Sequence, residues 1–260
     1  AAMNDSEIAQ VDDGVVLLPM TAGSVVLAYN LPKLKKPLSL SRDAYSKIFL
    51  GEISKWNDAA IAATNEGVEL PDLPVTVVRR ADSSGTTFVF TNHLSAVSKK
   101  FADGPGVGKT VNWPESDKFI AAPKNDGVTA TIMQTPGAIG YVEFGFAEQA
   151  KLPMATLENA SGKFIEPTLE NATAALAGVE MPEDLRAWLP DPSGENAYPI
   201  VSYTWLLCYE KYEDSAKADA LKSLVKWCLH QGQKSSAEMG YIPLPENVDT
   251  TVTQKLETIK

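Results

Sequence analysis

The run from Arg79 to Phe88 contains the side chains of this chain that are best suited to bind a charged group. Its sequence is RRADSSGTTF, and it follows the β-branched run Val75–Val78 and leads into an apolar stretch that can continue as a helix. The first turn of a helix has unpaired N–H groups and the positive end of the helix dipole. Ser84, Gly85 and Thr86 would add hydroxyls and a backbone that an anion can approach closely. The pattern predicts a site for a small tetrahedral oxyanion.

Arg80 and Asp82 are the charged pair inside this run. A guanidinium group offers a planar fork of donors that suits an oxyanion. A carboxylate at Asp82 would repel an anion, so we expect Asp82 to hold Arg80 in place. The alternative is an ordinary helix cap at Ser84 in a strand-turn-helix unit, which the local pattern fits equally well.

The segment Gly104–Thr110 resembles a nucleotide-binding P-loop. The G-x-x-x-x-G-K-T pattern, however, requires a glycine where this chain has Asp103. The segment also follows the expected helix end at Lys99–Phe101 and precedes Asn112–Pro114, which does not continue a helix smoothly. We expect no P-loop here.

The sequence predicts no catalytic residue, no metal site and no cofactor. The two histidines, His93 and His230, are far apart, and neither has cysteine, aspartate or glutamate neighbours at ligand spacing. Ser84 is no candidate nucleophile, because His93 follows it by about two and a half helical turns. We therefore expect a binding protein and no enzyme.

Length and composition are those of an ordinary globular protein. The chain has 260 residues, of which 44% are hydrophobic and 22% are charged, with a net charge of -10. This length can form one large domain or two smaller ones. The acidic balance argues against a nucleic-acid partner, since such proteins carry a basic patch. No stretch approaches the ~20 apolar residues of a membrane span, and Ala1–Asp5 lacks the basic start and apolar middle of a signal peptide.

Strands alternate with helices along the chain, which predicts an α/β architecture with largely parallel sheets. The strands expected from apolar and β-branched runs are Val15–Leu18, Val25–Tyr29, Val75–Arg80, Ala138–Val142 and Pro199–Tyr209, with a turn at Thr21–Gly23 between the first two. The expected helices span 41–50, the stretch after Thr86, 126–134 and 172–176. A further helix is expected to bury one apolar face made of Leu221, Leu224, Val225, Cys228 and Leu229.

The run from Arg79 to Thr91 is similar to the signature of the periplasmic phosphate-binding proteins, the PstS family of high-affinity phosphate ABC transporters. Other segments match this family in the right order: GSVVLAYNLP at 23–32, IFLGEISKWND at 48–58, KNDGV at 124–128 and PGAIGYVEF at 136–144. The resemblance runs essentially from end to end. It implies an α/β fold of the two-lobed, type II periplasmic solute-binding class, with the ligand cleft between the lobes.

The resemblance also implies the ligand and its contacts. The ligand would be inorganic phosphate, held by Arg80, Ser84, Gly85 and Thr86, with Asp82 supporting the arginine. A periplasmic, monomeric protein would close around phosphate by a hinge motion and deliver it to the permease subunits of a phosphate ABC transporter. Two alternatives stay open: the same fold binding sulfate, molybdate or phosphonate, and an enzyme that acts on phosphate esters.

The family pattern implies how the lobes divide. Residues 1–26 and 199–260 would be parts of a discontinuous first lobe and residues 27–198 the second, with crossings near Val25–Asn30 and Pro199–Ser202. Family members carry some tens of residues before the point that matches Ala1, with a Thr-Phe contact, a serine and an aspartate for phosphate. We therefore expect an incomplete first lobe and weak phosphate binding by this chain alone. Asp5 and Asp12 do not match that aspartate.

Cys208 and Cys228 are the two cysteines of the chain. One falls on an expected strand and the other on the core face of the following helix, so the two side chains could meet in a disulfide. An exported protein favours such a bridge. Two buried free thiols are an equal alternative.

Overall fold

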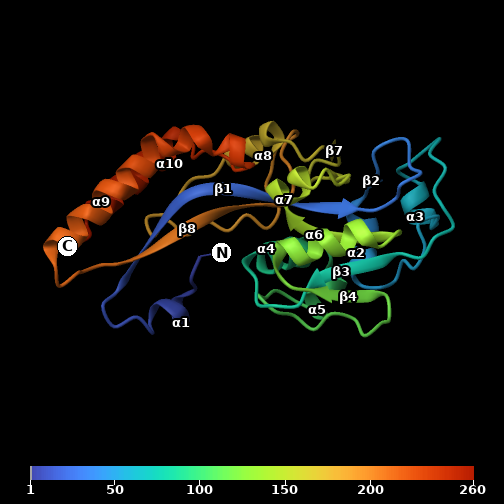
Figure 1. Cartoon of the computed structure of the whole chain (residues 1–260), viewed down its shortest axis with the longest axis horizontal. Coiled ribbons are helices and arrows are strands. Elements are labelled where there is room, and N and C mark those ends of the chain that lie inside the picture. The colour runs from blue at the N-terminus through green and yellow to red at the C-terminus, as the bar shows by residue number, and fades with distance from the viewer. Residues whose placement is uncertain (1) are drawn as a thin grey trace.

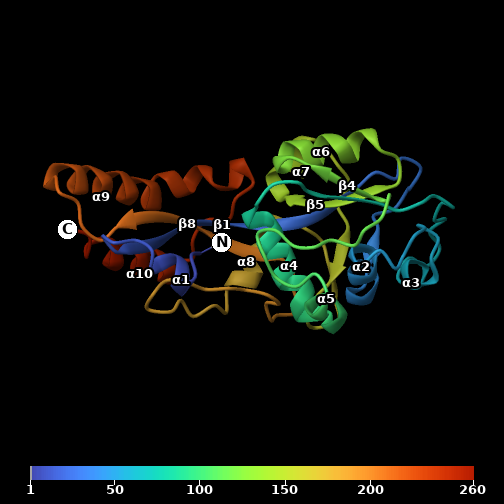
Figure 2. The same cartoon turned by 90° about the horizontal axis from the view of Figure 1, so that it is seen from below.

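The computed structural model describes residues 2–260 and consists of two halves joined by one sheet (Figures 1 and 2). The five strands of this sheet lie in the order β4-β3-β5-β1-β8. Their bounds are β1 (Val15–Tyr29), β3 (Thr76–Arg80), β4 (Phe119–Ala122), β5 (Ala138–Glu143) and β8 (Val201–Tyr209). β8 belongs to the first half, β3, β4 and β5 belong to the second, and β1 runs from one half into the other.

Three short strands form a separate sheet in the order β2-β6-β7, with bounds β2 (Ser39–Leu40), β6 (Thr156–Glu158) and β7 (Phe164–Ile165). The helices from β2 onward to β8 are α2 (Arg42–Phe49), α3 (Ala59–Ala62), α4 (Gly85–Val97), α5 (Lys99–Asp103), α6 (Lys124–Gln134), α7 (Phe144–Gln149) and α8 (Leu169–Leu176). Figure 2 shows α6 and α7 on one side of β5 and α4 and α5 on the other. The helices predicted at 41–50, 126–134 and 172–176 are confirmed as α2, α6 and part of α8.

The remaining helices lie in the first half: α1 (Asp5–Ile8), α9 (Ser215–His230), α10 (Glu246–Leu256) and the 3-10 turns η1 (Gly232–Ser235) and η2 (Ala237–Met239). The apolar face predicted for α9 is only partly correct. Val225 and Leu229 are buried, whereas Leu224 is 58% exposed. Among the described residues, α10 and the neighbouring strands cover only part of the apolar face of α9. None of the helices described is both long and apolar enough to cross a bilayer.

The prediction of two strands separated by a turn at Thr21–Gly23 is wrong. β1 is one strand of 15 residues, and its pairing with β8 shifts register between Pro19 and Thr21. Proline has no N–H to donate to a ladder, so an irregularity beside it keeps the strand continuous. Ala22 also exchanges two backbone hydrogen bonds with Ile242, of 3.0 and 2.8 Å, which hold the expected turn residues extended.

The prediction of largely parallel sheets holds for only part of the structure. β3 pairs in parallel with β4 and β5, and β2 pairs in parallel with β6. β1 runs antiparallel to both β5 and β8, and β7 runs antiparallel to β6. For the β1–β8 pair the reason is the connection between the halves: the chain enters the second half along β1 and returns just before β8, so these two strands run opposite ways.

Both cysteines are free thiols in the structure, Cys208 buried in β8 and Cys228 half-buried in α9. Of the two alternatives that the sequence left open, the structure therefore contains the free thiols and no bridge. Burial raises the pKa of the Cys208 thiol, which disfavours the reactive thiolate.

His93 is a buried titratable group in the core of the second half. Its Nδ1 lies 2.7 Å from the carbonyl oxygen of Pro190, and its Nε2 lies 2.8 Å from the hydroxyl of Tyr45. Because a carbonyl only accepts, Nδ1 carries the proton and Nε2 accepts from Tyr45. The imidazole is 1% exposed, and this burial lowers its pKa to about 4. His93 is thus a neutral structural bridge between α2, α4 and the segment before β8.

His93 makes the stability of the protein depend on pH. Below about pH 6.5 the unfolded chain binds a proton on this imidazole, whereas the folded protein does so only near pH 4. The free energy of unfolding should therefore fall by about 2 kcal/mol between pH 7 and pH 5 through this group alone. Urea denaturation of the natural protein and of His93→Gln checks this. The glutamine side chain keeps polar atoms at the site and does not titrate, so an equal loss of stability in both proteins would contradict the assignment.

Candidate functional site

The turn between β3 and α4 is the candidate site. β3 ends at Arg80 and α4 begins at Gly85, with Ser84 as its N-cap, so the predicted strand, turn and helix are confirmed. The Ser84 Oγ accepts from the backbone N–H of Thr87 at 3.3 Å. Among residues 2–260, the N–H groups of Gly85 and Thr86 have no hydrogen-bond acceptor. These two donors and the hydroxyls of Ser84 and Thr86 can therefore serve an anion, since the Ser84 Oγ accepts from Thr87 and keeps its own proton to donate.

Tyr141 of β5 fixes the turn at both ends. Its hydroxyl accepts from the backbone N–H of Arg80 at 3.1 Å and shares a hydrogen bond of 2.8 Å with the Thr87 hydroxyl. The ring is stacked on Phe90 of α4, with 4.6 Å between the ring centroids. Burial raises the pKa of Tyr141, so the hydroxyl stays protonated. The end of β3 and the start of α4 are thereby held at a set spacing.

Arg80 is held by Asp82 through two hydrogen bonds, as the sequence predicted. Nε lies 2.9 Å from Oδ1 and Nη2 lies 2.6 Å from Oδ2, while Asp82 also accepts from the backbone N–H of Lys124 at 2.9 Å. These bonds, that with Arg80 foremost, hold the pKa of Asp82 well below its usual range. The third nitrogen of Arg80, Nη1, has only a 3.5 Å contact with Asn125. Nη1 is therefore the part of the guanidinium that can donate to an anion.

The Gly104–Thr110 segment opens no helix and instead supports the turn from behind. The backbone N–H of Ser84 donates to the carbonyl of Lys109 at 2.9 Å. The N–H of Gly108 donates to the hydroxyl of Thr91 in α4 at 3.2 Å. This role could not be predicted from the sequence, because nothing in the spacing of residues 84 and 109 indicates a contact.

Glu143, at the end of β5, extends the site toward the first half. Its Oε2 lies 3.5 Å from the amide nitrogen of Asn125, and Tyr241, which follows η2, lines the same cavity as Glu143. Burial raises the pKa of Glu143. This cavity has a volume of about 110 Å³ and is lined by Glu143, Gly145, Phe146, Gln149, Met239 and Tyr241. Asn125 thus lies between Arg80 and Glu143, an arrangement that could not be predicted from the sequence.

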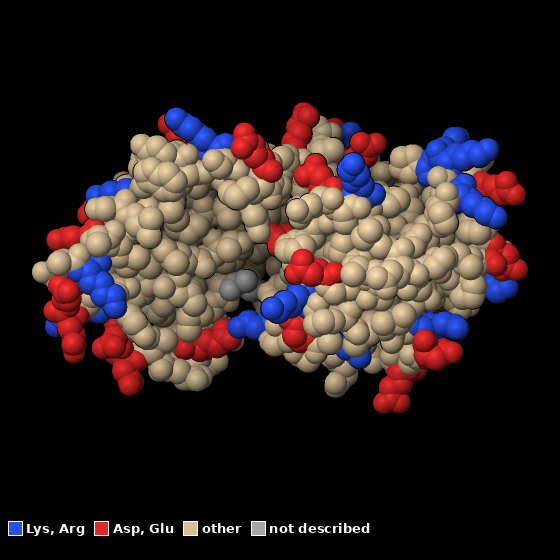
Figure 3. Space-filling model, viewed as in Figure 1, with Lys and Arg blue, Asp and Glu red and all other residues tan. Residues whose placement is uncertain are grey.

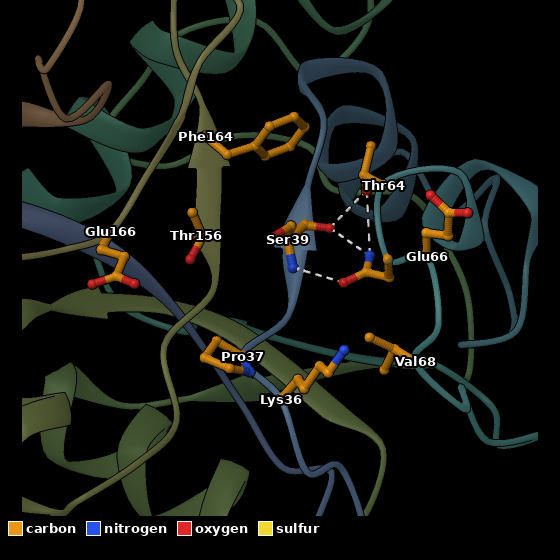
Figure 4. A pocket seen from close by; sticks show the side chains of 10 residues that line it. Lys36, Pro37, Ser39, Thr64, Glu66, Val68, Thr156, Phe164 and Glu166 are labelled. Carbon is orange, nitrogen blue, oxygen red and sulfur yellow. Dashed lines mark hydrogen bonds between the residues drawn. The ribbon is translucent and has the colours of Figure 1, made fainter.

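Two larger cavities lie elsewhere. One, of about 380 Å³, is lined by residues around β2 and β6, among them Ser39, Thr64 and Thr156 (Figure 4). Ser39 and Asn65 bond to each other there, with Asn65 Nδ2 2.7 Å from the Ser39 carbonyl, so these polar groups already have partners. The other, of about 450 Å³, lies along Val179–Ser193. Neither includes a residue of the Arg80–Thr86 turn.

The surface between the halves is hollowed on one face, with acidic and basic side chains at the edges of the hollow (Figure 3). Within residues 2–260 no cluster of three or more histidine, cysteine, aspartate or glutamate side chains could hold a metal ion. The chemistry that the turn offers is directed hydrogen bonding from a cation and from helix N–H groups, with one carboxylate neutralised by the cation.

Several known proteins are similar to this chain in sequence. The family model for the PBP superfamily domain matches residues 1–231. The chain is 42% identical over 255 residues to the phosphate-binding protein PstS of Methanocaldococcus jannaschii, which covers 91% of this chain and 65% of that protein. It is 36% identical over 249 residues to the protein of the same name from Xylella fastidiosa, covering 95% of this chain and 67% of that protein. The chain thus spans about two thirds of the length of these relatives.

A solved structure has the same fold. The high-affinity periplasmic phosphate-binding protein PfluDING, determined with bound phosphate, superimposes with a TM-score of 0.80 at 22% sequence identity. The match covers 98% of this chain and 76% of that one. The predicted fold class, a two-lobed α/β solute-binding protein, is confirmed by this similarity.

Proposed function

The chain belongs to the PBP superfamily and, within it, to the PstS family of phosphate-binding proteins, and on this basis we propose that it binds inorganic phosphate at the start of α4. Arg80, Ser84, Gly85 and Thr86 are the proposed ligands, and Asp82 orients Arg80. The relatives are named for phosphate binding, and PfluDING holds phosphate in its structure.

The donors at the turn support this function above all. Nη1 of Arg80 and the N–H groups of Gly85 and Thr86 are left without close acceptors among residues 2–260, whereas the other nitrogens of the guanidinium are satisfied by Asp82. Three such donors on one rigid turn match the several oxygens of a tetrahedral anion. The Tyr141 hydroxyl keeps them in place before the ligand arrives, so binding spends little free energy on ordering the site.

The division into two lobes is the basis of the proposed opening and closing of the site. β1 changes partner from β8 to β5 between Ser24 and Val25, and β8 begins at Val201. These positions support lobes of residues 1–26 with 199–260 and of residues 27–198. The lobes would close over phosphate by a small rotation about β1 and β8.

We further propose a place for this binding step. The protein would act in the periplasm, without a covalent step, and hand phosphate to the membrane permease of a phosphate ABC transporter. PfluDING is described as periplasmic, which supports the location. The signature around Arg80 supports the transport role.

Calorimetric titration of the natural protein tests the ligand. We expect weak but saturable binding of phosphate at one site per molecule, because the turn supplies only part of the contacts that the family resemblance implies. Tighter binding of sulfate, molybdate or phosphonate would assign the site to another oxyanion. Hydrolysis of p-nitrophenyl phosphate that is lost with Arg80→Ala would instead favour a phosphate-ester enzyme.

A further inference from the structure

Lys109 contacts two different parts of the molecule, α1 and the turn before α4. Its Nζ is 2.6 Å from Oε1 of Glu7 in α1, which lies below the β1–β8 pair in Figure 1. Its backbone carbonyl accepts from the N–H of Ser84, the N-cap of α4 in the second half. One residue thus bonds both to the first half and to the turn that carries the proposed ligands.

The loop around Lys109 is rigid enough to couple these two contacts. Thr91 accepts from the N–H of Gly108, and its hydroxyl lies 2.8 Å from the Thr87 carbonyl of the same helix. A Cβ on Gly108 would lie 2.7 Å from the carbonyl oxygen of Thr110, so the loop folds back on itself too tightly for a side chain there. A shift of Lys109 would therefore be passed to Ser84 without being absorbed in the loop.

Glu7 is held in position by hydrogen bonds at the start of α1. Its backbone N–H donates to the Asn4 side chain at 2.9 Å, and its Oε2 accepts from the backbone N–H of Asn4 at 2.9 Å. This capping box leaves Oε1 facing Lys109. The hydrogen bond from Lys109 lowers the pKa of Glu7, so the carboxylate stays charged. Arg186, which belongs to the lobe of residues 27–198, makes an ion pair of 2.7 Å with Asp5, so α1 contacts that lobe at a second point besides Lys109.

We propose that the Glu7–Lys109 ion pair is a clasp between the two lobes, which holds the Ser84 turn in its anion-binding position and slows the release of the anion. Lys109 is on this view a positioning residue that does not itself touch the ligand. The proposal rests on the proposed function, because phosphate is the anion whose release it slows. The Gly104–Thr110 segment, whose sequence resembles a P-loop, carries Lys109 and so supports the clasp.

A double-mutant cycle tests the clasp: Lys109→Met, which keeps the aliphatic stem and the carbonyl, Glu7→Gln, which keeps the capping box, and the two together. Both side chains are about a third to two fifths exposed, at 42% for Lys109 and 34% for Glu7. For a pair so exposed we expect the phosphate dissociation rate to rise about two- to fivefold in each single variant, with no further rise in the double variant. The rise should vanish at high salt, because salt screens exposed charges.

Lys99→Met is the matched control, since Lys99 pairs with Asp103 inside α5 and links no two lobes. Stopped-flow measurement of its dissociation rate should give the value of the natural protein. Effects of Glu7→Gln and Lys109→Met that add in the double variant would overturn the clasp, because each side chain would then act alone. An unchanged rate in Lys109→Met would overturn it as well.

A second measurement separates the clasp from the proposed ligand. Spin labels at Ser223 in the first half and Glu115 in the second, in protein with both cysteines replaced by alanine, report the distance between the lobes. Lys109→Met should broaden that distance distribution in the absence of any anion. If the natural protein binds no phosphate while the distribution still broadens, the proposed function fails and the clasp stands. A distribution that does not change would refute the clasp itself.

Discussion

Arg80→Ala should weaken phosphate binding by about 2–5 kcal/mol, the typical effect of removing one partner of a hydrogen-bonded charge pair between a protein and its ligand. The substitution acts twice. It removes the Nη1 donor, and it leaves the Asp82 carboxylate, both of whose oxygens bond to Arg80 in the natural protein, without its cationic partner beside the anion. Calorimetric titration of phosphate measures the loss.

Three further variants make the Arg80 result specific. Arg80→Lys should recover only part of the affinity, because an ammonium group lacks the planar fork. Adding Asp82→Asn to Arg80→Ala should also recover part, because it removes the unpaired charge. Arg79→Ala is the control: a neighbouring strand residue points to the opposite face of the sheet, so its loss should change affinity little. Near-natural affinity in Arg80→Ala would refute its assignment as a ligand.

Gly85→Val should reduce phosphate affinity on the order of a hundredfold, which corresponds to about 3 kcal/mol. Gly85 is the first residue of α4 and has helical backbone, which valine can adopt, so the fold should survive the change. The branched side chain would instead crowd the N–H groups of Gly85 and Thr86 that the anion must approach. Titration of phosphate, with circular dichroism to confirm the helix content, measures both effects.

Ser83→Ala is the matched comparison for Gly85→Val. Ser83 is exposed, lies in the same turn and precedes the N-cap, so its hydroxyl is not needed to cap α4. We expect its replacement to leave phosphate affinity within about twofold, as is usual for surface substitutions. Equal and small effects of the two substitutions would mean that the turn is only a helix cap, the alternative that the local pattern also fits.

Local features of this site could be predicted from the sequence because they depend on near neighbours. A β-branched run before a Ser-Ser-Gly-Thr turn specifies a strand that ends and a helix that starts, and the structure contains both. Asp82 lies two residues from Arg80, close enough for their pairing to follow from side-chain length and charge. The family signature occupies the same short run, so the fold class was also within reach of the sequence.

Features that join distant parts of the chain could not be predicted in this way. The hydroxyl of Tyr141, the carbonyl of Lys109 and the amide of Asn125 all lie more than twenty positions from the groups they contact in the turn. No periodicity encodes such contacts, because they depend on which strands become neighbours. The same is true of β1, which was expected to turn at Thr21–Gly23 and instead stays extended because β8 and Ile242 pair with it.

The sequence by itself therefore determined the chemistry of this protein: an arginine, its carboxylate partner and a helix start that offers N–H groups to an anion. Only the tertiary structure decided how that chemistry is held, through Tyr141 at the two ends of the turn and Lys109 behind it. The physical reason is that the backbone of a turn is set by its own residues, whereas its position relative to the other lobe is set by packing and hydrogen bonds between segments a hundred residues apart. The Glu7–Lys109 contact, which spans 102 positions, belongs wholly to the second kind.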